Sequence, residues 1–449
     1  MIMAGGIFKT ENEKLLPGAY VNVVSSKQQL IGSSDTDNGI VFMNLQGLDW
    51  GPRGVVIVDG KTNFLAVFGA EITSQALKPV FYALQKAAKL KVFNVNSDIK
   101  AAGTSAVLPW DFKAVYGGTK GNSITVTVEP DFNQVGKFVV ATIFQNIVVD
   151  TQSVVTASDF KGNLYVTGTD NSDDNGIAKL AVLETAVSVK FQGGVSTSSI
   201  EVIDEFVEAA LAEEFDVIYS SNAIVAAEIA QELRDKEGRK VQAVVPTLAN
   251  FSPDTEAVVA IRNGVILKDG TVLSNDIAAA YVAGLIASAE VNTSLTYSEF
   301  PNAVDVKPRL TRSEQEAAYR SGEMIFISSR GTVKIMSDIN TLTTFTEKKS
   351  VDFSKNRILR VLDEIADNTR VTWEDNFIGK VTNNAEGRDL FKANRVEHLT
   401  DLQASGAIAE FTPDDITIKE GDNKDTIVVE VAIKPTDAME KLYMTVNVG

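Results

Sequence analysis

The chain has 449 residues, no cysteine, one histidine and a formal net charge of −17 at pH 7. Because one hydrophobic core rarely organises so long a chain, we expect several domains. Without cysteine the chain can form neither disulfides nor thiolate metal sites, and it has no cysteine nucleophile. The negative charge, with no cluster of Lys and Arg in the sequence, disfavours nucleic acid and anionic lipid as partners.

An N-terminal arm is predicted for residues 1–38. Residues 19–24 form an extended, mostly apolar run, and the polar residues 25–38 follow it. This pattern is typical of a single strand on a loose connection. The first residues, Met1-Ile-Met-Ala-Gly-Gly6, lack the basic and continuous apolar regions of a signal peptide.

An α/β core is predicted in two parts, residues 39–97 and residues 193–344. The first part has the pattern of a strand, a helix and a second strand, a βα unit at residues 55–58, 79–90 and 91–96. The second part alternates helices with strands, at residues 200–213, 216–220, 222–237 and 241–246. Residues 277–291 are Ala-rich and contain Glu290, and they are too short to cross a bilayer, so we expect a buried helix there and no membrane partner.

The residues between the two parts have a different pattern. Residues 98–192 are β-rich and punctuated by Gly, Asn and Asp, with strands expected at residues 123–128, 138–144 and 164–167. We interpret them as a β-rich domain inserted into the α/β core. The fold class is therefore α/β and multidomain.

The last part, residues 345–449, is predicted to be an α+β domain. Ser354 can cap a helix with Ile358, Val361, Leu362 and Ile365 at helical spacing, and a second helix is expected at residues 387–404, before Gly406. Apolar residues then alternate along residues 426–433 and 442–448, which predicts two strands. The chain thus begins and ends with short lone strands.

No residues stand out as catalytic, cofactor-binding or metal-binding. The one histidine, His398, lies within the second C-terminal helix, and no G-x-S-x-G motif accompanies it, so a structural or surface role is favoured. The acidic residues 170–176 place Val182 where a calcium loop needs a glutamate, which favours a solvated turn. The Gly-rich residues 116–122 precede a strand and not a helix, which favours a tight turn with positive φ over a phosphate site.

Several short motifs nevertheless occur in an order that resembles one family, the tail sheath proteins of contractile phages and phage-tail-like bacteriocins. The motifs are Leu16-Pro-Gly-Ala-Tyr-Val-Asn22, Leu48-Asp-Trp-Gly-Pro52, Gly118-Thr-Lys-Gly-Asn122, Ile339-Asn-Thr-Leu-Thr343, Phe377-Ile-Gly-Lys380 with Asn383-Asn384, Gly387-Arg388, Gly406-Ala-Ile408 and Pro435-Thr-Asp-Ala-Met-Glu-Lys-Leu-Tyr443. They span nearly the whole chain. The resemblance is greatest to sheaths of Gram-positive myophages, defective prophages and R-type phage-tail-like bacteriocins.

The resemblance implies a structural protein without cofactors, and not an enzyme. Its α/β core would be subtilisin-like without catalytic residues, its β insertion would face outward, and its C-terminal domain would lie next to the tail tube. The subunits would assemble in the bacterial cytoplasm as stacked rings, hexameric by resemblance, and end in the tail of a virion or phage-tail-like particle. Contraction would then drive the tube through the target envelope, with tube, baseplate and tail terminator proteins as partners.

The resemblance also implies strand exchange between subunits, in which each terminal strand completes a sheet on a neighbour. The donated residues would be Tyr20, Val21, Val23 and Val24 at one end and Leu442, Met444, Val446 and Val448 at the other, and the acceptor strand would carry Ile427, Val429, Val431 and Ile433. The alternative is that both termini pair within one chain.

Arg388, Lys392 and Arg395 recur at helical spacing and could face an acidic strip on the tube. Because Asp389 and Glu397 are interleaved with them, a solvated basic face is the alternative. Two other classes of function also stay open at this stage. One is a virion or surface lattice protein that does not contract, and the other is a hydrolase that does not depend on histidine.

Overall fold

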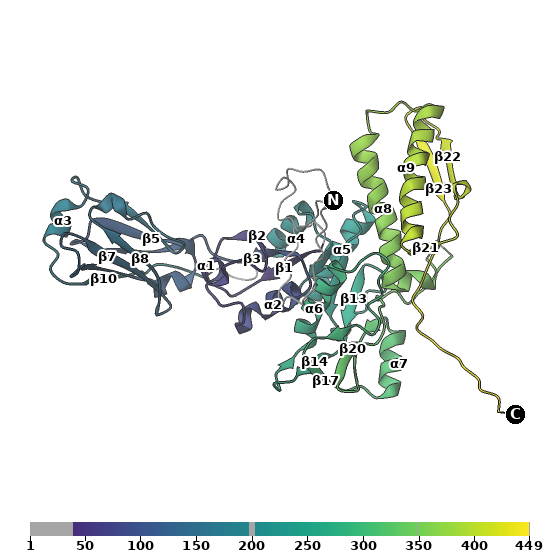
Figure 1. Cartoon of the computed structure of the whole chain (residues 1–449), viewed down its shortest axis with the longest axis horizontal. Helices are drawn as coiled ribbons and strands as arrows, with labels where there is room; N and C mark the ends of the chain where they lie inside the picture. The colour runs from purple at the N-terminus through teal and green to yellow at the C-terminus, as the bar shows by residue number, and fades with distance from the viewer. Residues whose placement is uncertain (1–38, 197–202, 348, 449) are drawn as a thin grey trace, which may run out of the picture. The chain divides into compact units, whose positions relative to one another are not determined.

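The computed structural model describes residues 39–196, 203–347 and 349–448 (Figure 1). The predicted N-terminal strand, with Tyr20, Val21, Val23 and Val24, lies outside these residues and stays a prediction. Within the described residues, the buried hydrophobic side chains form four clusters. Two lie on the faces of a central sheet, one lies in a β-rich unit and one in the C-terminal unit.

A seven-stranded sheet forms the α/β core, in the order β18-β13-β12-β11-β1-β3-β2. The strands are β1 (Ile40–Leu45), β2 (Gly54–Val58), β3 (Lys89–Asn94), β11 (Val217–Tyr219), β12 (Gln242–Pro246), β13 (Val258–Ile261) and β18 (Glu323–Met324). All neighbouring strands run parallel except β2 and β3. A parallel sheet needs cover on both faces.

Helices supply that cover: α2 (Lys78–Leu84), α6 (Asn275–Ala287), α4 (Ile203–Ala212) and α5 (Ala223–Asp235). Val41 and Met43 of β1 pack in the cluster that contains α2 and α6, whereas Phe42 packs in the cluster that contains α4 and α5. This alternation is the two-residue period of a strand. The predicted elements at residues 216–220, 222–237 and 241–246 are confirmed as β11, α5 and β12.

The first part of the core differs from the predicted βα unit. The strand β1, which directly follows the polar residues 25–38, is absent from the prediction, yet it is the parallel neighbour of β3. The predicted strand at residues 55–58 is present as β2, but it lies at the sheet edge and runs antiparallel to β3. The connection between parallel strands therefore runs from β1 to β3, and β2 and α2 both lie within it.

The predicted buried helix is confirmed as α6, which has buried residues on all sides. Its close approach to α2 depends on Gly284, because a Cβ there would lie 2.2 Å from the carbonyl oxygen of Ala83. In the part of the chain that the structure describes, no helix is both long and apolar enough to cross a membrane.

The second part of the core carries two further small sheets, β15-β14-β17 and β16-β20-β19. Their elements, with the neighbouring helix, are β14 (Gly264–Leu267), β15 (Val272–Leu273), β16 (Glu299–Phe300), β17 (Ala303–Lys307), α7 (Arg312–Arg320), β19 (Phe326–Ser329) and β20 (Thr332–Ile335).

The β-rich unit contains two sheets, β10-β6-β7-β8 and β4-β5-β9, around one hydrophobic cluster. Its elements are β4 (Lys100–Thr104), β5 (Trp110–Gly117), β6 (Thr125–Pro130), β7 (Phe138–Phe144), β8 (Ile147–Val154), β9 (Val166–Asp170), α3 (Ile177–Ala181) and β10 (Val187–Lys190). The strands predicted at residues 123–128, 138–144 and 164–167 correspond to β6, β7 and β9. The chain enters and leaves this unit at adjacent points, because Ala102 and Gln192 form an antiparallel bridge with both N–H···O distances at 2.9 Å.

The loop between β1 and β2 joins the core to the β-rich unit. Trp50 in this loop is fully buried within the hydrophobic cluster of the β-rich unit, against the rings of Tyr116 and Phe144. Its indole N–H donates to the carbonyl oxygen of Ala66 in α1 (Phe64–Phe68), at 2.8 Å.

The turn at residues 118–122 also contacts this loop, so two of the motifs lie together. The predicted positive φ is confirmed at Gly118, where φ is 101°. A Cβ at this position would lie 2.1 Å from the carbonyl oxygen of Asp49. The Thr119 hydroxyl donates to the Asp49 carboxylate at 3.0 Å, and the Lys120 N–H donates to the Asp49 carbonyl oxygen at 3.1 Å.

Replacing Gly118 by alanine is therefore expected to lower the free energy of unfolding by about 3 kcal/mol, since the backbone is strained and the new methyl group clashes with Asp49. Gly136 is a matched control, because its φ is also positive, at 84°, but a Cβ there has open space. The corresponding Gly136 variant should lose only about 1 kcal/mol. Urea unfolding of both variants measures the difference, and equal losses would contradict the role of the Asp49 contact.

The C-terminal unit packs two long helices against short strands around its own cluster. Its elements are α8 (Asn356–Asn376), α9 (Ala385–Ala404), β21 (Ile408–Ala409), β22 (Ile416–Glu420), β23 (Ile427–Val431) and β24 (Lys434–Pro435). The second predicted helix is confirmed as α9, which the Asn384 side chain caps and which ends before Gly406 at a φ of 75°. The predicted cap of the first helix is wrong. Ser354 lies in a preceding 3₁₀ turn and donates to the Val351 carbonyl oxygen, and Lys355 occupies the position before α8.

Candidate assembly surfaces

The segment after β24 is held to the protein at its beginning. An Arg357 guanidinium N–H donates to the carbonyl oxygen of Thr436 at 2.7 Å. Glu440 accepts hydrogen bonds from Lys355 and from the Thr296 hydroxyl, the latter at 2.7 Å. Residues 436–440 are therefore held against the subunit by hydrogen bonds at Thr436 and Glu440.

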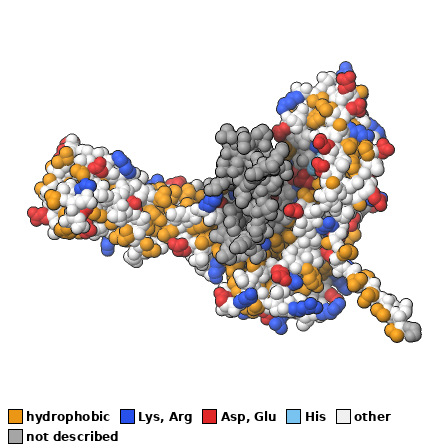
Figure 2. Space-filling model, viewed as in Figure 1, with side chains coloured by type: hydrophobic (Ala, Val, Ile, Leu, Met, Phe, Trp, Pro, Cys, Tyr) orange, Lys and Arg blue, Asp and Glu red, His pale blue; other side chains and the backbone are white. Residues whose placement is uncertain are grey.

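Beyond Glu440 the chain loses this support. Residues 442–448, which we call the C-terminal arm, form no strand within the single chain. The exposed fractions of Leu442, Met444, Val446 and Val448 are 85%, 74%, 72% and 92%. Figure 2 shows hydrophobic side chains along this arm. Among the described residues, no strand of the same chain pairs with this arm, and its alternating apolar side chains are exposed.

The predicted acceptor strand lies in a hairpin of two strands. In the described structure β23 pairs only with β22, from Ile416↔Val431 to Glu420↔Ile427, so one edge of β23 has no partner strand. Val429 and Ile433 pack against the C-terminal cluster, whereas Val431 is exposed. Ile433 lies beyond the end of β23. A free edge above a packed face is the geometry that accepts a further strand.

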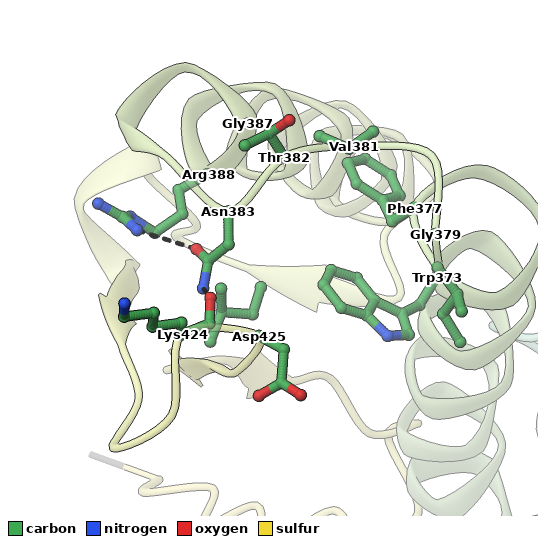
Figure 3. Close-up of a pocket in the computed structure, with 12 residues that line it drawn as sticks. Trp373, Phe377, Gly379, Val381, Thr382, Asn383, Gly387, Arg388, Lys424 and Asp425 are labelled. Atoms are coloured by element: carbon green, nitrogen blue, oxygen red, sulfur yellow. Dashed lines mark hydrogen bonds between the residues drawn. The ribbon is translucent and has the colours of Figure 1, made fainter.

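A hollow of about 510 Å³ lies where the connection between α8 and α9 meets the turn between β22 and β23 (Figure 3). The Asn383 amide N–H₂ donates to the carbonyl oxygens of Lys424 and Thr426, at 2.9 and 3.0 Å. Trp373 and Phe377 stack with ring centroids 5.5 Å apart and line the same hollow. The motifs at residues 377–388 thus fasten the helical pair to the hairpin.

The three residues predicted to face the tube do not share one exposed strip. Arg395 is only 4% exposed, and its guanidinium donates to Thr369 and Asn368 of α8, at 2.9 Å in each case. This corrects the expectation for Arg395, since the face of α9 that carries it packs against α8. Arg388 donates to the Asn383 side chain at 2.9 Å, and Lys392 is half-buried. Arg388 and Lys392 stay candidates.

A polar network at the start of α8 is absent from the sequence-based predictions. Asp338 is buried, and its carboxylate accepts from the Asn356 amide at 2.9 Å and from the Arg360 guanidinium at 2.6 Å. Asn340, from one of the motifs, donates through its side-chain amide to the side-chain Oδ1 of Asn356 at 3.2 Å. The sequence shows that these residues are polar. It does not show that they contact one another, because they are 16 to 22 positions apart and only the fold brings them together.

The residues considered for chemistry have structural surroundings. His398 is half-buried, with its Nε2 atom 4.0 Å from a Glu364 oxygen, and burial lowers its pKa. In the acidic turn, Asp170 accepts from the Ser172 N–H at 2.9 Å and Asp174 accepts from the Gly176 N–H at 3.1 Å. In the described parts of the chain, no group of three or more His, Asp or Glu residues is placed to hold a metal ion.

Two family models match this chain. The phage tail sheath protein central domain matches residues 196–341, and the phage tail sheath C-terminal domain matches residues 348–449. The phage-like element PBSX protein XkdK of Bacillus subtilis (strain 168) is 31% identical, with both chains covered in full. The tail sheath protein of Clostridium phage phiCD119 is 27% identical over 38% of this chain and 47% of that protein.

Solved structures show the same similarity. The sheath tail protein from Desulfitobacterium hafniense has a TM-score of 0.77 at 31% identity, with 95% of this chain and 99% of that chain covered. The sheath tail protein from Listeria innocua has a TM-score of 0.74 at 29% identity, with 92% and 96% covered. The helical sheath of the anti-feeding prophage in the contracted state has a TM-score of 0.52 at 11% identity, with 97% and 99% covered, which shows a shared fold.

These similarities define a multidomain, sheath-like fold of mixed helices and strands. The chain belongs to the phage tail sheath protein family, which is a structural family and not an enzyme family.

Proposed function

We propose that this chain polymerises around a tail tube and contracts, driving the tube through a target cell envelope. The observation that carries the proposal is the C-terminal arm, which is fastened at Glu440 and then presents alternating, exposed apolar side chains. Exposed apolar residues in a strand pattern favour addition to a sheet edge on another chain. The free edge of β23 is a suitable acceptor.

The proposal includes strand exchange at both ends of the chain. Residues 442–448 of one subunit would pair with β23 of another, and the N-terminal residues Tyr20, Val21, Val23 and Val24 would contribute a second donated strand. An added strand with about five ladder hydrogen bonds, each worth about 0.5–1.5 kcal/mol, stabilises the contact by several kcal/mol. Contacts of this strength can persist while the packed domains change their arrangement.

The remaining details of the proposal follow the family resemblance. The α/β core would be subtilisin-like without catalytic residues, and the β-rich unit would face outward. The subunits would form stacked sixfold rings in the bacterial cytoplasm, in contact with tube, baseplate and tail terminator proteins. The anti-feeding prophage sheath, which shares the fold and was solved in the contracted state, supports contraction as the mechanism.

Deleting residues 442–449 should abolish assembly without lowering subunit stability, because the apolar side chains of residues 442–448 are exposed in the part of the chain that the structure describes. Negative-stain electron microscopy of the concentrated protein should show hollow cylinders for the full chain and single subunits for the deletion. A second variant with Leu442, Met444, Val446 and Val448 replaced by serine keeps the backbone and tests the apolar contribution alone. Cylinders formed equally well by the deletion would contradict strand exchange through this arm.

A further inference from the structure

The last side-chain anchor of the described chain before the C-terminal arm is Glu440. One of its carboxylate oxygens accepts from the Thr296 hydroxyl at 2.7 Å, and the other accepts from the Lys355 ammonium. The side chains of Lys355 and Glu440 are 16% and 15% exposed, whereas Met439 and Leu442 on either side are almost fully exposed. The chain therefore changes from a bound to an exposed segment within two residues, between Glu440 and Leu442.

The Glu440 contacts close a ring of hydrogen bonds with the start of α8. The Thr296 hydroxyl that donates to Glu440 accepts from the Asp338 N–H at 3.0 Å. The Asp338 carboxylate in turn binds Asn356. Because Asn356 directly follows Lys355, the ring returns to Glu440. The position of the arm's base is thus coupled to the buried network that joins α8 to the core.

The charges around this ring favour the ion pair. Burial lowers the pKa of Lys355, but the hydrogen bond and charge of Glu440 raise it more, so that the pKa lies above its ordinary value. Tyr319 and Asp437 contribute in the same direction, and the Asp437 carboxylate lies 3.9 Å from the Lys355 ammonium. Lys355 therefore stays a cation throughout the neutral range.

We propose that Lys355 and Glu440 are positioning residues, which fix where and in which direction the C-terminal arm leaves the subunit. The inference rests on the proposed function, in which the arm pairs with a neighbouring subunit. A strand that leaves from a fixed point loses less conformational freedom when it pairs, so the pair lowers the cost of assembly. A pull on the paired arm is also transmitted to α8 and Asp338 and not only to the exposed chain.

The position of the arm can be measured in the isolated subunit, before any assembly. Because the chain has no cysteine, spin labels at Leu442→Cys and Ala317→Cys report one distance between the arm and α7. Glu440→Gln or Lys355→Met removes the ion pair, and we expect the remaining Thr296 contact to be too weak to hold the chain. The chain is then free back to Thr436, which lengthens the free segment before the label from two residues to six. The distance distribution should then broaden roughly 1.7-fold, since the spread of a flexible chain grows with the square root of its length.

Assembly gives the second readout. Glu440→Gln should raise the protein concentration at which cylinders appear by roughly tenfold, the effect of losing one charge-assisted hydrogen bond. The exchanged pair Lys355→Glu with Glu440→Lys should recover both readouts toward the original chain. Lys434→Met is the matched control, because it removes a Lys–Glu pair with Glu410 that is 71% and 72% exposed, and it should change neither readout.

An unchanged distance distribution in both single variants would overturn the anchor, even if the full chain assembles. A full chain that forms no cylinders would instead contradict the proposed function, and the distance measurement would still decide whether the anchor exists. Thermal unfolding of each variant separates loss of the anchor from loss of the fold, and the exchanged pair provides the decisive comparison if a single variant is unstable.

Discussion

Replacing Trp50 by alanine is expected to lower the free energy of unfolding by about 3–5 kcal/mol, the cost of emptying a buried aromatic site. The indole packs against Phe144 and Tyr165, with centroids 4.8 and 6.1 Å away, and it donates to the Ala66 carbonyl oxygen. Because Trp50 belongs to the core by sequence and to the β-rich unit by packing, the loss should also uncouple the two. Urea unfolding followed by circular dichroism should show a lower midpoint and a broader or divided transition.

Trp110 is the matched control for this prediction. It is also buried, and its indole N–H donates to the Ala157 carbonyl oxygen at 2.9 Å, but its ring contacts, Phe112 and Phe160, lie within the β-rich unit. Trp110→Ala should cost a similar free energy. Its effect on amide hydrogen exchange should be confined to β4–β10, whereas Trp50→Ala should also increase exchange in β1 and β2. The same exchange pattern in both variants would contradict a coupling role for Trp50.

Replacing Asp363 by asparagine is expected to cost about 3 kcal/mol, because it leaves a buried arginine without its counter-charge. Arg234 of α5 is buried and donates two hydrogen bonds to Asp363 of α8, at 2.8 and 2.9 Å. Burial lowers the pKa of Arg234, but the charge of Asp363 more than offsets this and the pKa is raised. The pair is one of the contacts that hold α8 against the core, so its loss should appear as a lower urea midpoint.

Two further variants test whether the loss of stability comes from the unpaired charge of Arg234. Arg234→Met combined with Asp363→Leu removes both charges and should recover most of the lost stability. Glu232→Gln removes the exposed partner of Lys236 on the same helix and should change stability by no more than about 0.5 kcal/mol. A double variant less stable than Asp363→Asn alone would show that the pair is favourable in itself, contrary to this account.

Local sequence signals were sufficient for some of the helices and strands, whereas α7 was not predicted and the helix predicted at residues 79–90 ends at Leu84. The periodic apolar pattern located α5, α6 and α9, and the Gly-rich residues 116–122 were predicted to form a turn with positive φ because a strand follows them, which Gly118 confirms. The pattern failed for β1, where a buried parallel strand has a short continuous apolar run that periodicity alone does not distinguish. It also failed for the direction of β2, because strand orientation depends on the fold and not on residue type.

The candidate surfaces show the same limit. Alternation along residues 442–448 predicted a strand, whereas the described structure has no strand there and leaves the apolar side chains exposed. Helical spacing placed Arg395 with Arg388, but it did not show that this face of α9 packs against α8. Lys355 and Glu440 are 85 positions apart along the chain, and Asp338 and Thr296 are 42 positions apart. Composition carries no information on such pairings.

The chain enters and leaves the β-rich unit at adjacent points, and this geometry allows the length of the inserted segment to vary. Ala102 pairs with Gln192, and Asn122 and Gly194 exchange two hydrogen bonds at 2.8 and 2.9 Å, so the ends of the segment are joined independently of what lies between them. The inserted segment is therefore closed by hydrogen bonds between its own first and last residues. Strands that lie far from these closing contacts and from Trp50 can therefore change in length while the central sheet keeps its register, because the ends of the inserted segment stay joined.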